Sequence, residues 1–409
     1  MSDALPLPPR PNSEQYKKLA KDLQRAAKSG DPDAVRQWAT RWEDTFGAAR
    51  LAQRFAEFQK SDAPCTLTAA QFFLARSHGF LSWPKFSRHL EELARAHSPI
   101  SQFETAADAI VTGDAATLAK LLSENPHLVR ARSTREHRST LLHYVSANGI
   151  EDFRQKTPSN ILEITTLLLN AHADVNAESD AYAGRSTTLG LTATSVHPEA
   201  AGVQLPLLQL LLDRGALIDG RDGASTVNAC LANGRGPAAE FLASRGARLD
   251  FEGAAGVGRL DIVQSAPATE KQLLDGFAWA CEFGRTAVVE YLLDRGVPID
   301  AKLRNHGNTA LHWAAYGAHA DTVRLLLDRG APLDIRDQSF DGTPLDWALH
   351  EWTHSARNDA FYQVVALLAR AGAKLNWGAY EEYPDGRDAA KLRSDPRMIA
   401  ALSGEIIAD

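Results

Sequence analysis

The segment 305–337 constrains the fold of this chain more than any other part of the sequence. It reads NHGNTALHWAAYGAHADTVRLLLDRGAPLDIRD, in which two short apolar stretches at helical spacing are separated by turns. Gly307 predicts a tight turn, Thr309 opens a first helix, and Gly330 ends a second one. The leucine run 325–327 predicts that the second helix is buried. A helix pair of this size cannot bury its apolar face alone, so neighbouring copies should stack against it.

The same frame recurs elsewhere in the chain. Related openings begin near Thr140, Thr187, Ser225, Asp275 and Thr343. Together with 305–337 they make six recognisable units, most of which end their second helix with glycine. His172 stands where that glycine is usual, which predicts a weaker or strained helix end. These units resemble ankyrin repeats, and the resemblance implies an all-α solenoid whose ligands bind the concave surface.

Degenerate units are expected at both ends of the repeats and in their middle. Residues 105–133 have the helix pair without the usual opening, 253–266 read as a compressed repeat, and 388–402 predict a short capping helix pair. Atypical ends are expected because the terminal units of a solenoid present a polar outer face. The predicted domains are an N-terminal helical domain (1–100), the ankyrin repeats (101–378) and a C-terminal capping segment (379–409).

The first hundred residues predict a helical domain with an aromatic core. An amphipathic helix is expected from about Ser13, and the expected core residues are Phe72, Phe73, Phe80, Trp83 and Phe86. The string LTAAQFFLARSHGFLSWPKFSRHLEELA resembles the helical segment that precedes ankyrin repeats in many bacterial proteins. That resemblance implies a bacterial cytoplasmic origin and assigns no activity. A stacking platform for nucleic acid is the alternative, but basic and acidic residues balance here, which favours a core.

Composition narrows the classes of partner. The net charge is −7 without basic clusters, which argues against nucleic acid as the main partner. No run of about 18 apolar residues is present, so neither a membrane span nor a membrane partner is expected. The three cysteines, Cys65, Cys230 and Cys281, are too few and too dispersed for a disulfide framework. Cys230 and Cys281 fall on first helices of repeats, where buried residues are usual. A cytoplasmic location is therefore expected.

The predicted function is that of a recognition scaffold that binds a protein or peptide in the concave groove. Groove residues come from two places in each repeat: the end of its first helix, and the tip of the turn that precedes that helix, which we call the finger. The predicted set is His137, Asn148, Arg185, Ser195, Asn233, Glu282, His306, Tyr316, Phe340, Asp341, His350 and Glu351. The plainer interpretation is that these polar residues are simply solvated, as groove residues often are. His143 and His312, in the TxLH openings, are predicted to link neighbouring repeats and so to be structural.

Three insertions between paired helices bear on the kind of ligand. They span 152–160, 197–206 and 353–360, and all are expected on the edge opposite the fingers. They are interpreted either as binding loops that wall off the groove or as lengthened surface turns. An open groove suits a protein or peptide, whereas a closed one suits a small molecule.

An enzyme is the competing class of function. Glu282, His350 and Glu351 are its candidate catalytic residues, because histidines and carboxylates in a partly closed groove can act in acid–base chemistry. The string HEWTH at 350–354 also matches HExxH, in which His350 and His354 would bind zinc. A helix end before His354 is expected, which argues against that site. Its third ligand would be Glu381, Glu382, Asp359 or His319, none at a family spacing. Apart from this zinc alternative, no cofactor is predicted.

Overall fold

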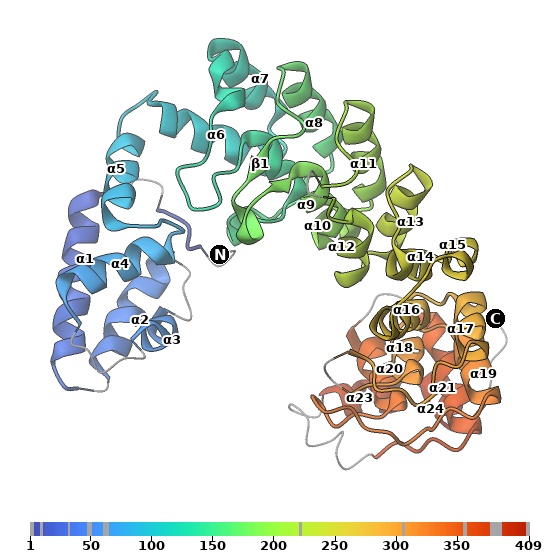
Figure 1. Ribbon diagram of the computed structural model, residues 1–409. Coiled ribbons are helices and arrows are strands. Elements are labelled where there is room, and N and C mark those ends of the chain that lie inside the picture. The colour runs from blue at the N-terminus through green and yellow to red at the C-terminus, as the bar shows by residue number, and fades with distance from the viewer. Residues whose placement is uncertain are drawn as a thin grey trace. The chain divides into compact units, whose positions relative to one another are not determined.

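The chain folds into helices that form two compact units, an N-terminal unit (Met1–Gly223) and a C-terminal unit (Ala224–Asp409). The computed structural model describes residues 4–8, 11–31, 33–46, 51–59, 65–220, 223–304, 307–354, 358–376 and 387–405. Among the described residues, the strands are β1 (Glu178–Ser179) and β2 (Ser186–Thr187), which pair antiparallel as a small hairpin. The remaining elements are α-helices and short 3-10 helices (Figure 1), as the predicted fold class requires.

The N-terminal unit begins with helices around an aromatic core. These are α1 (Ser13–Lys28), α2 (Ala34–Phe46), α3 (Leu51–Phe58), α4 (Leu67–Ser77) and α5 (Trp83–Leu93). α1 begins where predicted, because the Asn12 side chain accepts a hydrogen bond from the Glu14 N–H. Phe73, Phe80 and Phe86 are buried, which confirms most of the predicted core. Phe72 is 40% exposed and was placed in the core wrongly. The buried face of α4 passes through its neighbour Phe73, which turns Phe72 towards the helix flank.

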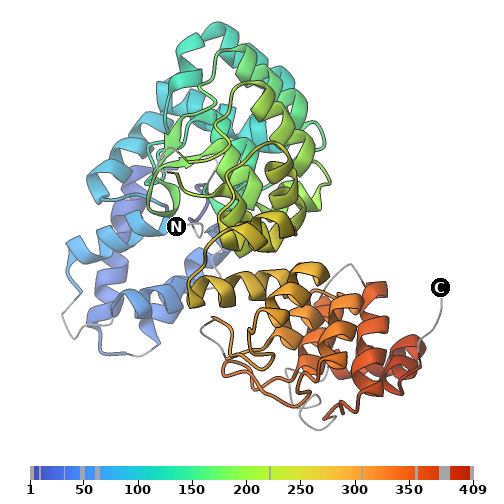
Figure 2. The same cartoon turned by 45° about the vertical axis from the view of Figure 1, so that its right-hand side comes forward.

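Repeat-like helix pairs complete the N-terminal unit. They are α6 (Pro99–Thr112), α7 (Ala115–Glu124), η1 (Pro126–Arg130), η2 (Leu141–Ser146), η3 (Asp152–Arg154), α8 (Ile161–Asn170), η4 (Ala181–Ala183), α9 (Thr188–Thr194), α10 (Val196–Ala200) and α11 (Gln204–Asp213). α6 and α7 confirm the helix pair expected within 105–133. The second helices α7, α8 and α11 contact one another in chain order (Figure 2). His172 has φ +64°, so the strain predicted at that helix end is present.

Regular repeats make up the C-terminal unit. Their helices are α12 (Thr226–Ala232), α13 (Gly236–Ser244), α14 (Phe251–Val257), α15 (Leu260–Ser265), α16 (Glu270–Glu282), α17 (Thr286–Asp294), α18 (Ala310–Tyr316), α19 (Ala320–Asp328), α20 (Pro344–His354), α21 (Asn358–Arg370), α23 (Arg387–Ser394) and α24 (Pro396–Leu402). The first helices α12, α14, α16, α18 and α20 contact in order, and so do the second helices α15, α17, α19 and α21. The compressed repeat and the capping pair are present as α14–α15 and α23–α24.

Burial in the repeats follows the helical spacing. Leu326, Val364 and Leu368 are fully buried, as predicted. Leu325 is only half-buried, because the buried line of α19 runs through Thr322, Val323 and Leu326 and leaves Leu325 at its flank. The cysteines are all free thiols in buried positions. No helix among the described residues is long and apolar enough to cross a membrane.

His143 and His312 link neighbouring repeats, as predicted. In each ring Nδ1 accepts a hydrogen bond from the backbone N–H of a threonine, Thr140 at 3.2 Å and Thr309 at 3.1 Å. Each ring therefore carries its proton on Nε2, which donates to a carbonyl of the following repeat. Those acceptors are the Ser186 carbonyl at 3.2 Å and the Gly342 carbonyl at 3.1 Å. Burial lowers the pKa of His143 to about 4 and also lowers that of His312, so both stay neutral.

Candidate functional site

The last turns of α16, α18 and α20 bring Glu282, Tyr316 and Glu351 together. These helices are successive first helices of repeats, so their ends lie side by side. The Tyr316 side chain forms a hydrogen bond with Glu351. Burial raises the pKa of Tyr316, and the negative charges of Glu351 and Glu282 raise it further. Tyr316 remains 36% exposed, so this cluster reaches the surface.

The Tyr316 ring packs against two tryptophans. The rings of Trp313, Tyr316 and Trp347 meet edge to face, with centroids 5.3 to 6.1 Å apart. The Trp313 Nε1–H donates to Asn308 Oδ1 at 2.8 Å, and the Trp347 Nε1–H donates to Asp337 Oδ2 at 3.0 Å. Hydrogen bonds to the finger residues Asn308 and Asp337 therefore fix both indoles, and the Tyr316 ring packs against these fixed rings.

Glu282 is held by an ion pair beneath this surface. Its carboxylate accepts a hydrogen bond from Arg304 at 2.7 Å, and its side chain is only 10% exposed. Burial raises the pKa of Glu282, and the Arg304 guanidinium opposes that rise. Arg304 also lies 4.0 Å from the centroid of the Trp313 ring. Glu282 was predicted to be exposed, but this contact turns it inward.

The finger before α20 presents an aromatic side chain to solvent. Asp337 Oδ1 accepts hydrogen bonds from the Ser339 and Phe340 N–H groups, each at 2.8 Å. Its Oδ2 accepts one from the Gly342 N–H at 3.0 Å. The turn leaves Phe340 76% exposed. We call Tyr316, Phe340, Trp347 and Glu351 the aromatic-acidic surface.

The HEWTH segment lies within α20, which continues to His354. The prediction that the helix ends before His354 is wrong, because α20 includes this residue. The His354 Nδ1 lies 2.8 Å from the carbonyl oxygen of His350, one turn earlier in the helix. The two imidazoles lie 4.5 Å apart between centroids on one face of the helix. Two suggested third ligands are engaged elsewhere: Asp359 pairs with Arg397, and His319 donates to the Glu282 carbonyl.

No group of three histidine, cysteine or acidic residues among the described residues could hold a metal ion. Glu381 and Glu382 lie outside the described residues. Zinc at His350 and His354 stays a prediction. Acid–base chemistry by Glu282, His350 and Glu351 also stays a prediction. The structure brings the two glutamates to Tyr316, while the exposed His350 ring lies against the His354 ring at an angle of 34°.

Other predicted groove residues have structural partners. The Asn148 amide donates to the Leu191 carbonyl and to Thr194 Oγ1, both at 3.1 Å, and so joins two repeats. Exposed Asn233 donates to its own helix, and exposed Arg185 lies 3.6 Å from Glu178. Asp341 is exposed beside Phe340 with φ +52°. His306 lies outside the described residues.

Two residues predicted for the groove are buried, and for them the prediction is wrong. Ser195 is 1% exposed, because it immediately precedes the inserted helix α10 and its carbonyl accepts a hydrogen bond from buried Gln204. His137 is 7% exposed, because its ring lies against Glu151, with 3.4 Å between Nε2 and Oε1. The insertion 197–206 folds as the end of α10, a short turn at 201–203 and the start of α11.

A buried network of charges surrounds His137 and was not predicted. Glu104 accepts hydrogen bonds from Arg135 and Arg154, each at 2.7 Å, and Arg135 also pairs with Glu151 at 3.0 Å. All four side chains are at most 9% exposed. Burial would raise the pKa of Glu104, but the two guanidinium groups lower it below its usual value. The insertion 152–160 supplies Arg154 from η3, so it completes this network.

Comparison with protein families identifies part of the C-terminal unit. Residues 254–339 and 277–378 match the family model described as ankyrin repeats (3 copies). This part of the chain is therefore a stack of ankyrin repeats, preceded by a helical N-terminal region. The crystal structure of the human ASB11 ankyrin repeat domain is similar over 64% of this chain and 96% of its own, at 20% identity and a TM-score of 0.33. No curated protein matches the chain.

Proposed function

We propose that this protein is a recognition scaffold that binds a polypeptide through the aromatic-acidic surface. Ankyrin repeats generally serve as protein-interaction scaffolds. The observation that carries the proposal is the exposure of two aromatic side chains: Phe340 (76%), and Tyr316 (36%), which packs on two tryptophans fixed by hydrogen bonds. Tyrosine and tryptophan are the residues most enriched at the centres of protein interfaces.

The chemistry of the surface indicates the chemistry of the ligand. Phe340, Tyr316 and Trp347 offer aromatic faces on which an apolar side chain can pack. Glu351 and exposed Asp341 offer carboxylate oxygens, which accept hydrogen bonds from lysine, arginine or backbone N–H groups. The proposed ligand is therefore a segment with an apolar side chain close to a basic one. We also propose that the protein meets this ligand in the bacterial cytoplasm, because its N-terminal segment resembles the one that precedes ankyrin repeats in many bacterial proteins.

Selection from a displayed peptide library tests this proposal. The full-length protein is the bait, and a Tyr316→Ala/Phe340→Ala double variant is the matched counter-bait. We expect the wild-type protein to enrich peptides that place an apolar residue near lysine or arginine. Each selected peptide should bind the double variant about tenfold or more weakly, because loss of a central aromatic contact typically costs over 1 kcal/mol. Enrichment of the same peptides by both baits, or no enrichment by the wild-type protein, contradicts the proposal.

A further inference from the structure

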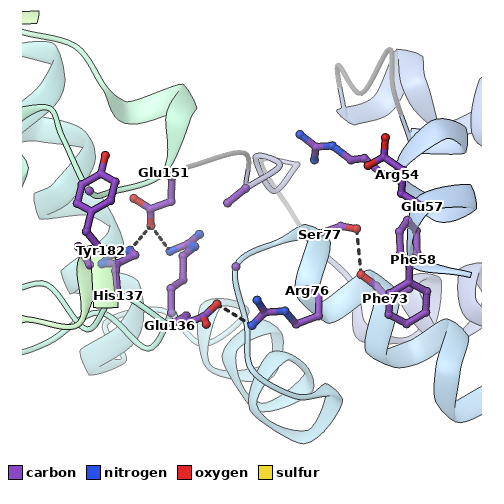
Figure 3. Close-up of a pocket in the computed structure, with 15 residues that line it drawn as sticks. Arg54, Glu57, Phe58, Phe73, Arg76, Ser77, Glu136, His137, Glu151 and Tyr182 are labelled. Atoms are coloured by element: carbon purple, nitrogen blue, oxygen red, sulfur yellow. Dashed lines mark hydrogen bonds and ion pairs between the residues drawn. The ribbon is translucent and has the colours of Figure 1, made fainter. Parts of the chain in front are cut away.

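A cavity in the N-terminal unit has the composition of a small-molecule site. Its volume is about 560 Å³, within the range of pockets that enclose small ligands. The N-terminal helices line one side with Phe58, Phe73 and Arg76, and the repeats line the other with His137, Glu151 and Tyr182 (Figure 3). This cavity is separate from the aromatic-acidic surface, which belongs to the C-terminal unit.

Glu151 leaves one carboxylate oxygen unsatisfied at this cavity. Its neighbours all approach Oε1: Arg135 at 3.0 Å, Tyr144 at 3.3 Å, His137 at 3.4 Å and Arg154 at 3.5 Å. In Figure 3 the dashed line from His137 ends at one oxygen of this carboxylate, and a second dashed line ends at the same oxygen. Oε2 is buried and has no hydrogen-bond partner among the described residues. A buried acceptor without a donor is costly, so a ligand that supplies an N–H gains that interaction.

The other charges that line the cavity already have partners. Arg76 pairs with Glu136 at 2.6 Å, and Arg135 is bound by Glu104 as well as by Glu151. The His137 Nδ1 accepts a hydrogen bond from the Ser139 N–H at 3.1 Å, so a neutral ring carries its proton on Nε2 and faces Glu151. Glu57 also lines the cavity, but it is exposed and accepts a hydrogen bond from Gln53 at 3.2 Å. The buried acceptor left for a ligand is Glu151 Oε2, which favours a hydrogen-bond donor of positive charge.

Aromatic side chains provide the remaining contacts. Phe58 and Tyr182 are 39% and 63% exposed at the cavity, and Phe73 lies beside Phe58 with 5.4 Å between ring centroids. The Tyr182 O–H donates to Asn148 Oδ1 at 2.6 Å, which fixes the ring. Gly149 permits this approach, because a Cβ at that position would lie 2.8 Å from the Cβ of Ala181. Aromatic faces attract organic cations and pack against hydrocarbon.

We propose that this cavity binds a small organic amine. The ammonium group donates a hydrogen bond to Glu151 Oε2, and the hydrocarbon part packs on Phe58, Phe73 and Tyr182. The ammonium belongs either to a free amine or to a lysine side chain of a peptide. This site is independent of the proposed polypeptide interface and goes beyond it.

Phenethylamine is a suitable probe, with 3-phenylpropionate as a control of similar shape and opposite charge. Binding to the full-length protein is measured by ligand-observed NMR titration. We expect saturable binding of phenethylamine and binding of 3-phenylpropionate that is at least tenfold weaker. Glu151→Gln should weaken phenethylamine binding about tenfold or more, since a charge-assisted hydrogen bond is lost. A capped lysine peptide that binds more tightly than phenethylamine would assign the ammonium to a polypeptide.

Two further variants keep the test independent of folding, because Glu151 also belongs to the buried network. Tyr182→Ala and Phe58→Ala remove exposed rings and should each weaken phenethylamine binding about two- to fivefold. Ile399→Ala, at an exposed residue of the C-terminal unit outside the aromatic-acidic surface, is the matched control and should leave binding unchanged. The proposal is overturned if phenethylamine does not bind, if 3-phenylpropionate binds equally well, or if Tyr182→Ala and Phe58→Ala bind as the wild type does.

Discussion

The two units bury charge in different ways. In the N-terminal unit, Glu104, Arg135, Glu151 and Arg154 lie together inside the fold. Among the described residues of the C-terminal unit, Asp337 is the buried carboxylate, and it serves a finger turn. Each ion pair described there keeps at least one side chain 27% or more exposed, from Arg329–Asp294 at the surface to Arg304–Glu282, in which the arginine is the exposed partner. A repeat frame thus accommodates buried charge when an insertion supplies its partner, as η3 supplies Arg154.

The largest expected difference between the units comes from Arg135→Met. This change leaves Glu104 and Glu151 buried with one guanidinium fewer, which typically costs about 3–5 kcal/mol. Hydrogen exchange followed by mass spectrometry should show lost protection in peptides of the N-terminal unit. Arg324→Met, at an exposed pair with Asp321, is the control and should change stability by under about 1 kcal/mol. Equal effects of the two changes would show that the buried network does not stabilise this unit.

The repeat-linking histidines should behave alike in both units. His143→Ala and His312→Ala each leave a threonine N–H and a carbonyl without a hydrogen-bond partner. Such a loss lowers the free energy of unfolding by about 1–3 kcal/mol. Protection should fall in the unit that carries the change, measured by the same exchange experiment. His127→Ala, at an exposed position, is the control. If either linking variant matched this control, the hydrogen bonds of that histidine would contribute nothing to stability.

Acid should weaken the N-terminal unit before the C-terminal unit. Burial lowers the pKa of His78 to about 3 and of His89 and His143 to about 4, and in the C-terminal unit it also lowers the pKa of His312. A histidine in the unfolded chain gains a proton near pH 6.5. The buried histidines of the folded protein stay neutral until the pH is much lower. Stability is therefore complete above about pH 6.5 and falls as the pH drops towards about 4.

Exchange of backbone amides between pH 7 and pH 5, corrected for the intrinsic rate, measures this loss. Peptides of the N-terminal unit should lose more protection than those of the C-terminal unit. The reverse order, or equal losses, would contradict the link between buried histidines and acid sensitivity. His89→Phe, which removes one titrating group and keeps an aromatic ring, should reduce the pH dependence of the N-terminal unit.

The smallest effect on stability is expected at the aromatic-acidic surface. Phe340→Ala removes a side chain that is 76% exposed, so its free energy of unfolding should change by under about 0.5 kcal/mol. The affinity for a selected peptide should nevertheless fall about tenfold. Thermal unfolding and a peptide titration of the same sample separate the two outcomes. A large loss of stability without a loss of affinity would make Phe340 a structural residue.

Sequence patterns predicted the repeat frame well, because turns and helix ends depend on local residues such as Thr309 and Gly330. They also predicted the roles of His143 and His312, whose hydrogen bonds follow from the repeat motif. They failed where burial depends on distant segments. Ser195 is buried beside the inserted helix α10, and His137 is buried against Glu151, and local spacing encodes neither contact.

The buried network could not be predicted for a related reason. Glu104, Arg135, Glu151 and Arg154 come from separate segments, and each resembles an ordinary solvated charge in its local sequence. The same holds for the cavity beside them, which forms between the N-terminal helices and the first repeats. Tyr316, Glu351 and Phe340 occupy regular repeat positions, so the repeat frame could suggest them, and their part in binding stays a prediction.

Site-specific photo-crosslinking tests the proposed recognition function most directly. A benzophenone amino acid at position 340 is compared with one at position 72, another exposed phenylalanine, in the cells that make the protein. We predict a crosslinked polypeptide at position 340 that disappears when Tyr316→Ala is added, and none at position 72. The same crosslinks at both positions, or none at position 340, would contradict the assignment of this surface as the recognition site.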